Sequence, residues 1–280
     1  MRGMKTRKRQ TMTKPGRKRR FLIDHPYCCF CGGTEPSVEI DHVPPKACFH
    51  RDFFPEGFEF PACSACNRGS KKDDQICGFY TQLLDFNQSN RTARDTERLL
   101  ELRDAIARNY PDALPDLSTA VPIQKVGSII TPRPIAVSVQ TNIQFRQSLP
   151  TLQRKLTHAL YYRDIGKSLT KAHTFQSGVY QIQGSPNILS EYFSKLLPNH
   201  TVGSRINIKN YGERFIYKSG YKEDEDFFVY AAQFGKGLII FGITLSSSMA
   251  PKVQYNDALP LQFAGHREIR LYSRTPVEST

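Results

Sequence analysis

The sequence predicts an α+β protein in which a small cysteine-rich module precedes a larger mixed domain that ends in antiparallel strands. Two observations predict this class. All seven cysteines of the 280-residue chain lie between residues 24 and 86. Beyond residue 200, short runs of alternating apolar residues replace the three- and four-residue spacing found earlier in the chain. Hydrophobic residues make up 39% of the chain, which is enough to build a core. The sequence contains no run of 18 apolar residues, so it predicts no membrane-spanning helix.

The first twenty residues carry most of the net charge. The formal charge is +13, yet residues 1–20 hold ten basic and no acidic residues, so residues 21–280 have a balance of only +3. This segment has no apolar periodicity, and we predict a basic, disordered arm that attracts nucleic-acid phosphates. The candidate phosphate contacts are Arg7, Lys8, Arg9, Arg17, Lys18, Arg19 and Arg20 in the arm, and Arg68 further along. No apolar segment of a secretory signal follows the arm, which indicates a cytoplasmic protein.

Two C-x2-C pairs define the module predicted over residues 21–86. Cys28 and Cys31 form the first pair, and Cys63 and Cys66 form the second. Each pair places two thiolates on one tight turn, so two pairs together supply the four tetrahedral ligands of a structural Zn2+ site. Buried thiols or two disulfides are the alternative, which a reducing compartment disfavours. Cys29 is a second-choice ligand because of its C-x-C spacing. Cys48 and Cys77 are expected to be small core residues.

The remaining elements follow from periodicity. Helical spacing predicts helices over residues 72–86, 92–109, 152–162 and 188–197. A connector over residues 87–134 contains the second of these helices and a proline-rich stretch. Residues 135–280 form the predicted C-terminal α+β domain, to which the sequence gives no role. Its predicted strands are residues 135–145, 205–208, 214–217, 226–233 and 238–245, with a hairpin turn at Gly235–Gly237.

Chemistry-bearing side chains lie between and just after the cysteine pairs. Asp41 and His42 lie in the loop that the metal would close, and Asn67 follows Cys66 directly. Carboxylate and amide oxygens suit Mg2+ or Mn2+, and a neighbouring histidine can take a proton from water at neutral pH. These are the parts needed to hydrolyse a phosphodiester. The structural alternative makes Asp41-His42 a surface pair in a turn, and Asn67 a cap for a helix that starts near Ser70.

These residues together carry a resemblance to a known family. Asp41-His42-Val43-x-Pro45, framed by the two cysteine pairs and followed by Asn67 and Lys71 or Lys72, resembles the HNH endonucleases of the ββα-metal fold with a four-cysteine zinc ribbon. A looser similarity is to bacterial HNH proteins with a C-terminal extension. The resemblance covers roughly Cys28–Lys72. It implies that His42 activates water, that Asp41 and Asn67 hold one Mg2+ or Mn2+ ion, and that Lys71 or Lys72 neutralises phosphate charge.

The expected activity is therefore endonucleolytic hydrolysis of DNA that leaves 5′-phosphate and 3′-hydroxyl ends. RNA is the alternative polymer, and a non-catalytic zinc-ribbon module that binds nucleic acid is the alternative function. The family's middle Asn has no match in residues 53–61, and Asp52, Glu56 or Glu59 is the candidate to brace the loop instead. The resemblance also implies a nucleoid-associated protein in restriction, mobile elements or anti-phage defence. Its C-terminal domain would contact a second copy or a regulatory partner.

Overall fold

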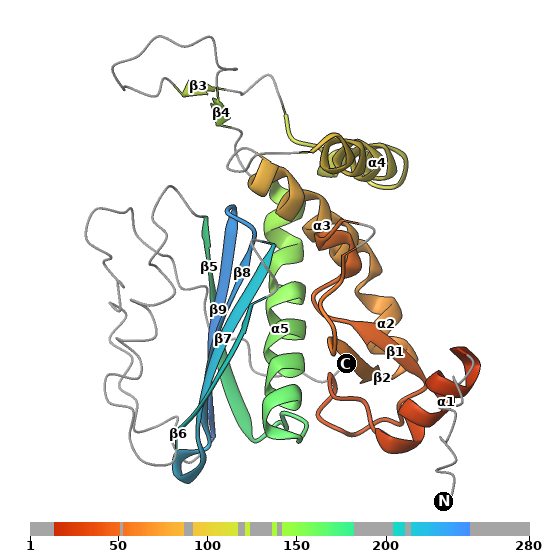
Figure 1. The fold of residues 1–280 in the computed structure, drawn as a ribbon, viewed down its shortest axis with the longest axis vertical. Helices are drawn as coiled ribbons and strands as arrows, with labels where there is room; N and C mark the ends of the chain where they lie inside the picture. The colour runs from red at the N-terminus through yellow and green to blue at the C-terminus, as the bar shows by residue number, and fades with distance from the viewer. Residues whose placement is uncertain are drawn as a thin grey trace, which may run out of the picture.

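The computed structural model describes residues 14–50, 53–86, 92–116, 121–123, 136–138, 142–181, 204–210 and 214–246 (Figure 1). The predicted α+β class is confirmed, since helices and antiparallel sheets are both present. A long helix, α5 (Ile143–Ile165), runs through the middle of the molecule. A five-stranded sheet covers one side of it, and the cysteine-rich part of the chain lies on the other side (Figure 1). The site described below therefore lies against this central helix.

The cysteine-rich part folds as a hairpin followed by helices. Strands β1 (Glu39–His42) and β2 (Glu59–Ala62) pair in antiparallel register, with His42 opposite Glu59 and Asp41 opposite Phe60. A 3-10 turn, η1 (Lys46–Cys48), lies in the loop between them. Helix α2 (Ser64–Gly69) follows the hairpin at once, and α3 (Lys71–Phe86) matches the helix predicted over residues 72–86.

The prediction of a disordered arm over residues 1–20 is wrong for residues 14–20, which are helical. Helix α1 (Lys14–Asp24) includes five of the arm's ten basic residues, and residues 1–13 lie outside the described part of the chain. Two contacts explain the helix. Arg20 pairs with Asp24 one turn later at 3.0 Å, and Arg17 pairs with Glu59 of β2 at 2.8 Å. The Asp24 carboxylate within the helix and the Glu59 carboxylate of β2 thus pair with basic residues that the sequence alone presents as unpartnered.

Helix α4 (Ala93–Asn109) agrees with the predicted helix over residues 92–109. Thr92 and Asp95 cap it reciprocally, and the turn η2 (Pro111–Ala113) follows it. The short strands β3 (Val121–Ile123) and β4 (Ala136–Ser138) pair with each other. The strand predicted over residues 135–145 is therefore right only at its start, and residues 143–145 open α5 instead. The Asn142 side chain accepts a hydrogen bond from Gln144 N at 2.7 Å, and this cap begins the helix early.

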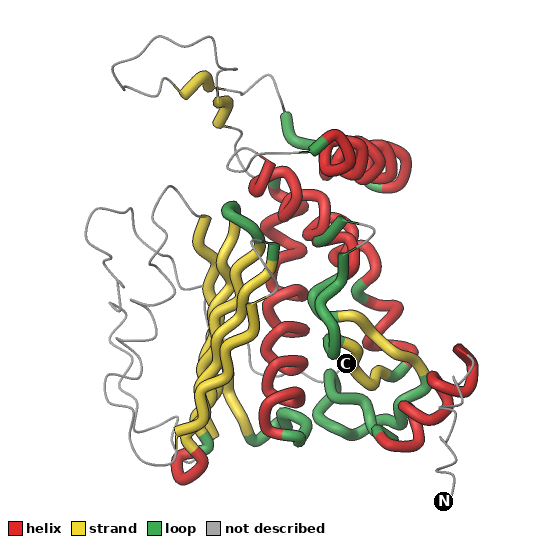
Figure 2. The backbone as a smooth tube through the Cα atoms, viewed as in Figure 1, coloured by secondary structure: helices red, strands yellow, loops and turns green. Residues whose placement is uncertain are grey.

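The C-terminal strands form one antiparallel sheet in the order β5-β9-β8-β7-β6 (Figure 2). The four predicted late strands are confirmed as β6 (Ser204–Asn210), β7 (Phe215–Lys222), β8 (Phe227–Phe234) and β9 (Leu238–Ser246). A short 3-10 turn, η4 (Glu223–Glu225), joins β7 to β8. The sequence missed β5 (His173–Gln181), which pairs with β9 along its whole length. The helix predicted over residues 188–197 lies outside the described residues.

The turn between β8 and β9 ties the sheet to α3. Gly235 has φ +53°, a left-handed backbone that favours glycine. A Cβ atom at Gly235 would overlap the Asp85 carboxylate at the end of α3, and the backbone N–H of Lys236 donates to Asp85 Oδ1 at 2.7 Å. The predicted hairpin turn is therefore confirmed, and its glycine also permits the close approach to α3.

One hydrophobic core runs through both halves of the chain. Phe58, next to β2, packs edge-on against Phe215 and Tyr217 of β7, with ring centroids 5.3 and 5.6 Å apart. Phe49 packs in the same way on Phe215 and lies 6.3 Å from Phe234. The module predicted over residues 21–86 and the domain predicted over residues 135–280 therefore share their buried surface. Among the described helices, none has the length and apolar character to cross a membrane.

Candidate metal centre and active site

Four cysteines converge at the base of the β1–β2 hairpin. The sulfur atoms of Cys28, Cys31, Cys63 and Cys66 all lie within 4.8 Å of one another. The two C-x2-C pairs come from separate turns, before β1 and after β2. This donor set fits a tetrahedral metal ion such as Zn2+, with four thiolates and no open position. The predicted four-cysteine site is therefore confirmed as an arrangement of ligands.

The backbone around these cysteines favours thiolates. Phe30 N donates to Cys28 Sγ and Cys66 N donates to Cys63 Sγ, each at 3.4 Å. A hydrogen bond from the Cys66 thiol is the main cause that lowers the pKa of Cys28 to about 5, against the opposing effect of burial. A cysteine that is already a thiolate near neutral pH needs to release no proton when a metal ion binds.

The other three cysteines are buried outside the cluster. Cys29 and Cys77 have no exposed surface and Cys48 has 6%. Burial raises the pKa of Cys48 to about 12, so this thiol stays protonated. Cys48 and Cys77 are core residues, as the sequence predicts. Cys29 likewise lies in the core, where its carbonyl accepts a hydrogen bond from His158 Nδ1–H of α5 at 3.1 Å.

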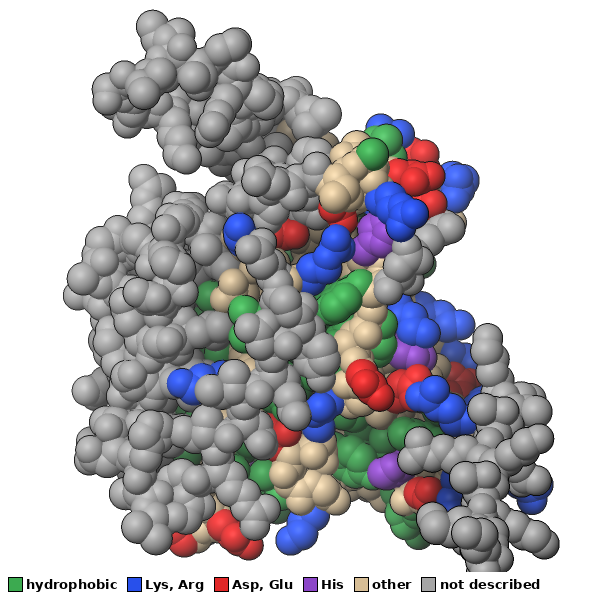
Figure 3. All heavy atoms as spheres, viewed as in Figure 1, with side chains coloured by type: hydrophobic (Ala, Val, Ile, Leu, Met, Phe, Trp, Pro, Cys, Tyr) green, Lys and Arg blue, Asp and Glu red, His purple; other side chains and the backbone are tan. Residues whose placement is uncertain are grey.

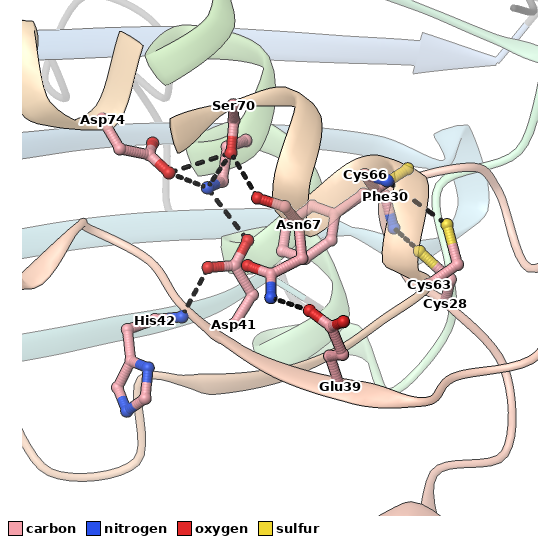
Figure 4. A network of polar contacts seen from close by, with 11 residues as sticks. Cys28, Phe30, Glu39, Asp41, His42, Cys63, Cys66, Asn67, Ser70 and Asp74 are labelled. Carbon is pink, nitrogen blue, oxygen red and sulfur yellow. Dashed lines mark hydrogen bonds and ion pairs between the residues drawn. The ribbon is translucent and has the colours of Figure 1, made fainter. Parts of the chain in front are cut away.

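Adjacent residues of β1 present Asp41 and His42 to different surroundings. Asp41 is 6% exposed, and its Oδ1 accepts a hydrogen bond from the backbone N–H of His42 at 2.8 Å. Figure 4 shows the His42 ring on the side of the strand away from Asn67. The surface-pair alternative therefore fails for Asp41, which is buried, whereas the His42 side chain remains 25% exposed.

Asn67 lies in the last turn of α2 and binds β1. Its Nδ2 donates to Glu39 Oε2, and Figure 4 shows its amide oxygen turned toward Asp41. Glu39 and Asp41 share one face of the strand because they are two residues apart. The helix-cap alternative for Asn67 is wrong, since its side chain bonds across to the strand and the turn after α2 is closed through Ser70.

Glu39 also holds Arg68, one of the candidate phosphate contacts. Arg68 Nε and Nη2 donate to Glu39 Oε1 at 3.1 and 3.0 Å. The hydrogen bond from Asn67 is the main cause that lowers the pKa of Glu39; burial opposes it, and the hydrogen bonds from Arg68 and Ser64 add to the lowering. The Arg68 side chain is 67% exposed, so it stays open to solvent while one carboxylate orients it.

A buried lysine completes the surroundings of Asp41. Lys155 of α5 is 1% exposed, and its Nζ lies 2.9 Å from Asp41 Oδ2 and 2.7 Å from Asp74 Oδ2. It also donates to Ser70 Oγ at 2.8 Å. Burial alone would lower the pKa of Lys155, but the two carboxylates outweigh it and raise the pKa. Burial raises the pKa of Asp41, and the Lys155 charge opposes that rise.

His42 is positioned by the strand opposite. Glu59 Oε1 lies 3.5 Å from His42 Nε2, and Glu59 Oε2 accepts from Arg17 of α1 at 2.8 Å. The His42 ring packs edge-on against Phe54, over which the Lys46 ammonium also lies. Of the three residues expected to brace this loop, Glu59 contacts His42. Glu56 is exposed at the turn, and Asp52 lies outside the described residues.

The remaining candidate residues within the described part of the chain lie at the surface. Lys71 and Lys72 are exposed in the first turn of α3, and Lys72 donates to Gln144 Oε1 of α5 at 3.1 Å. Lys18 and Arg19 are exposed on α1, and Arg7, Lys8 and Arg9 lie outside the described residues. Figure 3 shows basic side chains interspersed with acidic ones and histidines on the N-terminal half. Outside the arm of residues 1–20, the face seen in Figure 3 therefore carries charges of both signs.

Two charged groups of the site, Glu39 and Lys155, were not predicted from the sequence, although the sequence contains a pattern that indicates each. Glu39 precedes Asp41 by two residues, so strand alternation places both on one face. Lys155 lies between Leu152 and Leu156 on the apolar stripe of a predicted helix, a position that a lysine occupies only when a carboxylate meets it. Comparison with known proteins adds no further assignment, since no family model, curated protein or solved structure matches this chain.

Proposed function

We propose that this protein is a metal-dependent endonuclease of the HNH type that hydrolyses phosphodiester bonds in DNA. The observation that carries the proposal is the joint placement of Asp41, His42 and Asn67 on a hairpin and helix clamped by four cysteines. The order of two antiparallel strands followed by a helix is that of the ββα-metal fold named above. No residue of this set comes from the part of the chain beyond Phe86, so the chemistry belongs to the N-terminal half.

His42 supplies the base. Its ring is part-exposed, so water can reach it, and Glu59 holds Nε2 from the opposite strand. Burial, followed by the charge of Lys46, lowers the pKa of His42, which keeps the imidazole neutral at pH 7. A neutral imidazole accepts the proton of an attacking water, and Glu59 stabilises the imidazolium that results.

Asp41 and Asn67 are the residues that would hold a divalent cation. Asp41 Oδ2 is buried and pairs with the Lys155 ammonium at 2.9 Å, and the Asn67 amide oxygen faces the Asp41 carboxylate (Figure 4). These hard oxygen donors fit Mg2+ or Mn2+. When bound, such an ion supplies charge neutralisation at the scissile phosphate and its leaving oxygen. Asn67 is oriented for this role by its hydrogen bond to Glu39, which fixes which end of the amide faces Asp41.

The basic helix α1 supplies attraction for the polymer. Arg17, Lys18, Arg19 and Arg20 are exposed, and Arg17 is tied to Glu59 beside His42. Basic residues gain affinity by releasing the counterions condensed on DNA. We therefore assign DNA as the substrate, with its backbone passing along α1 toward His42.

A cleavage assay with matched histidine variants tests this function. Supercoiled plasmid and single-stranded DNA are incubated with the zinc-loaded protein in Mg2+, in Mn2+ and in EDTA. We expect cleavage only with the divalent ion, and a loss of about 100- to 10,000-fold in rate for His42→Ala, which is the usual contribution of a general base. His50→Ala changes a histidine of the same half that contacts Arg94 O, and should cleave like the wild type.

The same assay separates the alternative function. A non-catalytic module would bind DNA with no cleavage under any of these metal conditions. Cleavage that His42→Ala leaves unchanged would show that a different residue, or a contaminant, carries the activity. Zinc content and thermal unfolding of each variant are measured in parallel, so that a lost rate is not confused with a lost fold.

A further inference from the structure

The charge that lies closest to Asp41 comes from the other half of the molecule. Lys155 is in the middle of α5, about a hundred residues beyond the hairpin, and its side chain is 2% exposed. A lysine at this depth is costly unless carboxylates surround its ammonium group. Lys155 meets that condition with Asp41 and Asp74 and gives a hydrogen bond to Ser70 as well.

These contacts divide into a fixed side and a functional side. On the fixed side, Lys155 donates hydrogen bonds to Asp74 Oδ2 at 2.7 Å and to Ser70 Oγ at 2.8 Å, and Ser70 Oγ itself donates to Asp74 Oδ2 at 2.8 Å. On the functional side, the ammonium faces Asp41 Oδ2 as an ion pair. The three side chains of the fixed side thus lock the ammonium in place whether or not Asp41 has another partner.

The charges of Lys155, Asp74 and Asp41 leave one negative charge over, which suits a bound cation. Asp74 compensates Lys155, and the pair as a whole is neutral. Asp41 therefore keeps its own negative charge for a cation, while the Lys155 ammonium fixes where Oδ2 lies. The backbone N–H of His42 fixes Oδ1 in the same manner. Both carboxylate oxygens of Asp41 are held, although Asp41 belongs to a strand of four residues at the edge of the core.

We infer that Lys155 is a positioning residue for the cation site formed by Asp41 and Asn67, so that α5 completes the nuclease site from the C-terminal half. The inference rests on the proposed function and adds a residue that the HNH-like segment does not contain. It states that the Lys155–Asp74–Ser70 group presets Asp41 before a cation arrives, and that losing the group weakens cation binding. A lysine that merely competed with the cation would have the opposite effect.

The test measures Mn2+ binding directly, by the electron paramagnetic resonance signal of free Mn2+, on the full-length zinc-loaded protein. Lys155→Met alone leaves Asp74 buried without its partner and risks unfolding, so the informative variant is Lys155→Met/Asp74→Asn. It removes one positive and one negative charge together, which leaves the net charge near Asp41 unchanged. Arg146→Met removes a charge from an exposed position of the same helix and serves as the matched control.

We expect the double variant to bind Mn2+ at least tenfold more weakly than the wild type, with its zinc content retained, and Arg146→Met to bind like the wild type. Mn2+ affinity of the double variant within twofold of the wild type, or tighter, would overturn the inference. Asp41→Asn reports on the proposed function separately. If Asp41→Asn binds Mn2+ as well as the wild type does, or if the wild type binds none, the proposed cation site fails and the role of Lys155 fails with it. If Asp41→Asn loses Mn2+ binding but the double variant keeps the wild-type affinity, the cation site stands and only the role of Lys155 is wrong.

Discussion

At the level of single residues, the proposed function makes cleavage depend on the protonation of His42. Burial and then Lys46 lower the pKa of His42 below its usual 6.5, and Glu59 opposes both. A general base acts in its neutral form, which predominates above its pKa, so cleavage should fall as the pH drops through this lowered value. We predict that the acidic limb of the pH–rate profile lies below pH 6.5, measured as initial plasmid cleavage rates at fixed Mg2+ between pH 4.5 and 8.

Two substitutions of opposite charge should move that limb in opposite directions. Glu59→Gln removes the group that raises the pKa of His42 and should shift the limb to lower pH. Lys46→Met removes a group that lowers it and should shift the limb to higher pH. Glu59→Gln should also slow cleavage at pH 8, because the ring loses its partner. Identical limbs in both variants and in the wild type would mean that a residue other than His42 titrates in the reaction.

His158 is a residue whose burial affects stability and not chemistry. It has no exposed surface, and burial is the main cause that lowers its pKa to about 4. The unfolded chain would protonate this residue near pH 6.5, so stability is full above that pH and is lost as the pH falls toward 4. We predict that His158 accounts for about 2 kcal/mol of the stability lost between pH 7 and pH 5.

Urea unfolding of wild type and His158→Gln at the two pH values measures this contribution. The variant should be less stable at pH 7 but should lose about 2 kcal/mol less on going to pH 5. Leu156→Ala is the matched control, because it creates a cavity in the same helix with no change in titration, and should keep the wild-type pH dependence. Equal pH dependence in His158→Gln and Leu156→Ala would contradict the assignment.

At the scale of elements, the two cysteine turns decide whether the hairpin can form. Strands β1 and β2 have four residues each, too few to be stable as an isolated pair. A metal ion at the four cysteines closes the chain at the base of both strands. We predict one Zn2+ per chain by plasma mass spectrometry, and a marked fall in thermal stability after chelation or in Cys63→Ser.

Cys77→Ala provides the control for this prediction. Cys77 is fully buried, as Cys28 is, but lies on α3 outside the cluster, so its loss should leave the zinc content at one per chain. Asp41 and His42 follow the first cysteine turn and Asn67 follows the second, so chelation should also abolish Mn2+ binding. A chelated protein that keeps its melting temperature would show that the four thiols serve as core residues only.

Elements were predictable from the sequence where one periodic pattern decides them. Helix α3 and helix α4 have regular apolar spacing, and β8 and β9 are runs of β-branched and aromatic residues. The predicted bounds of these four elements therefore lie within one residue of the observed ones. Strand β5 was missed because its residues (HTFQSGVYQ) have few apolar positions, and its pairing with β9, some sixty residues away, is what fixes it. The helical part of the basic arm was missed for the same reason, since Glu59 lies far away in the sequence.

The candidate site divides in the same way. The four cysteines, Asp41, His42 and Asn67 lie in short spacings that the sequence displays. Glu59 and Lys155 reach the site only through strand pairing and helix packing, and no local pattern determines either contact. The groups proposed to carry the chemistry are therefore easier to predict from the sequence than the groups that hold them in place.

For the whole molecule, the shared core implies that the two halves fold together. Phe49 and Phe58 of the N-terminal half rest on aromatic residues of β7 and β8, and Lys155 lies between two carboxylates of that half. Each buried aromatic side chain stabilises the fold by about 1.5–3 kcal/mol, and a domain of this size has only about 5–15 kcal/mol to lose. We predict that the fragment of residues 1–134, although it contains every cysteine, does not fold alone.

Without α5 and the sheet, that fragment exposes Phe49 and Phe58 to water and leaves Asp41 and Asp74 as unpaired like charges. It should show no cooperative thermal transition, should bind an apolar dye strongly, and should bind Mn2+ no better than Asp41→Asn, even in excess zinc. The full chain, prepared and zinc-loaded in parallel, is the control. A fragment with a sharp transition and wild-type affinity for Mn2+ would mean that the cysteine-rich half is an independent nuclease module. In that event, the packing of α5 against it would be incidental to the site.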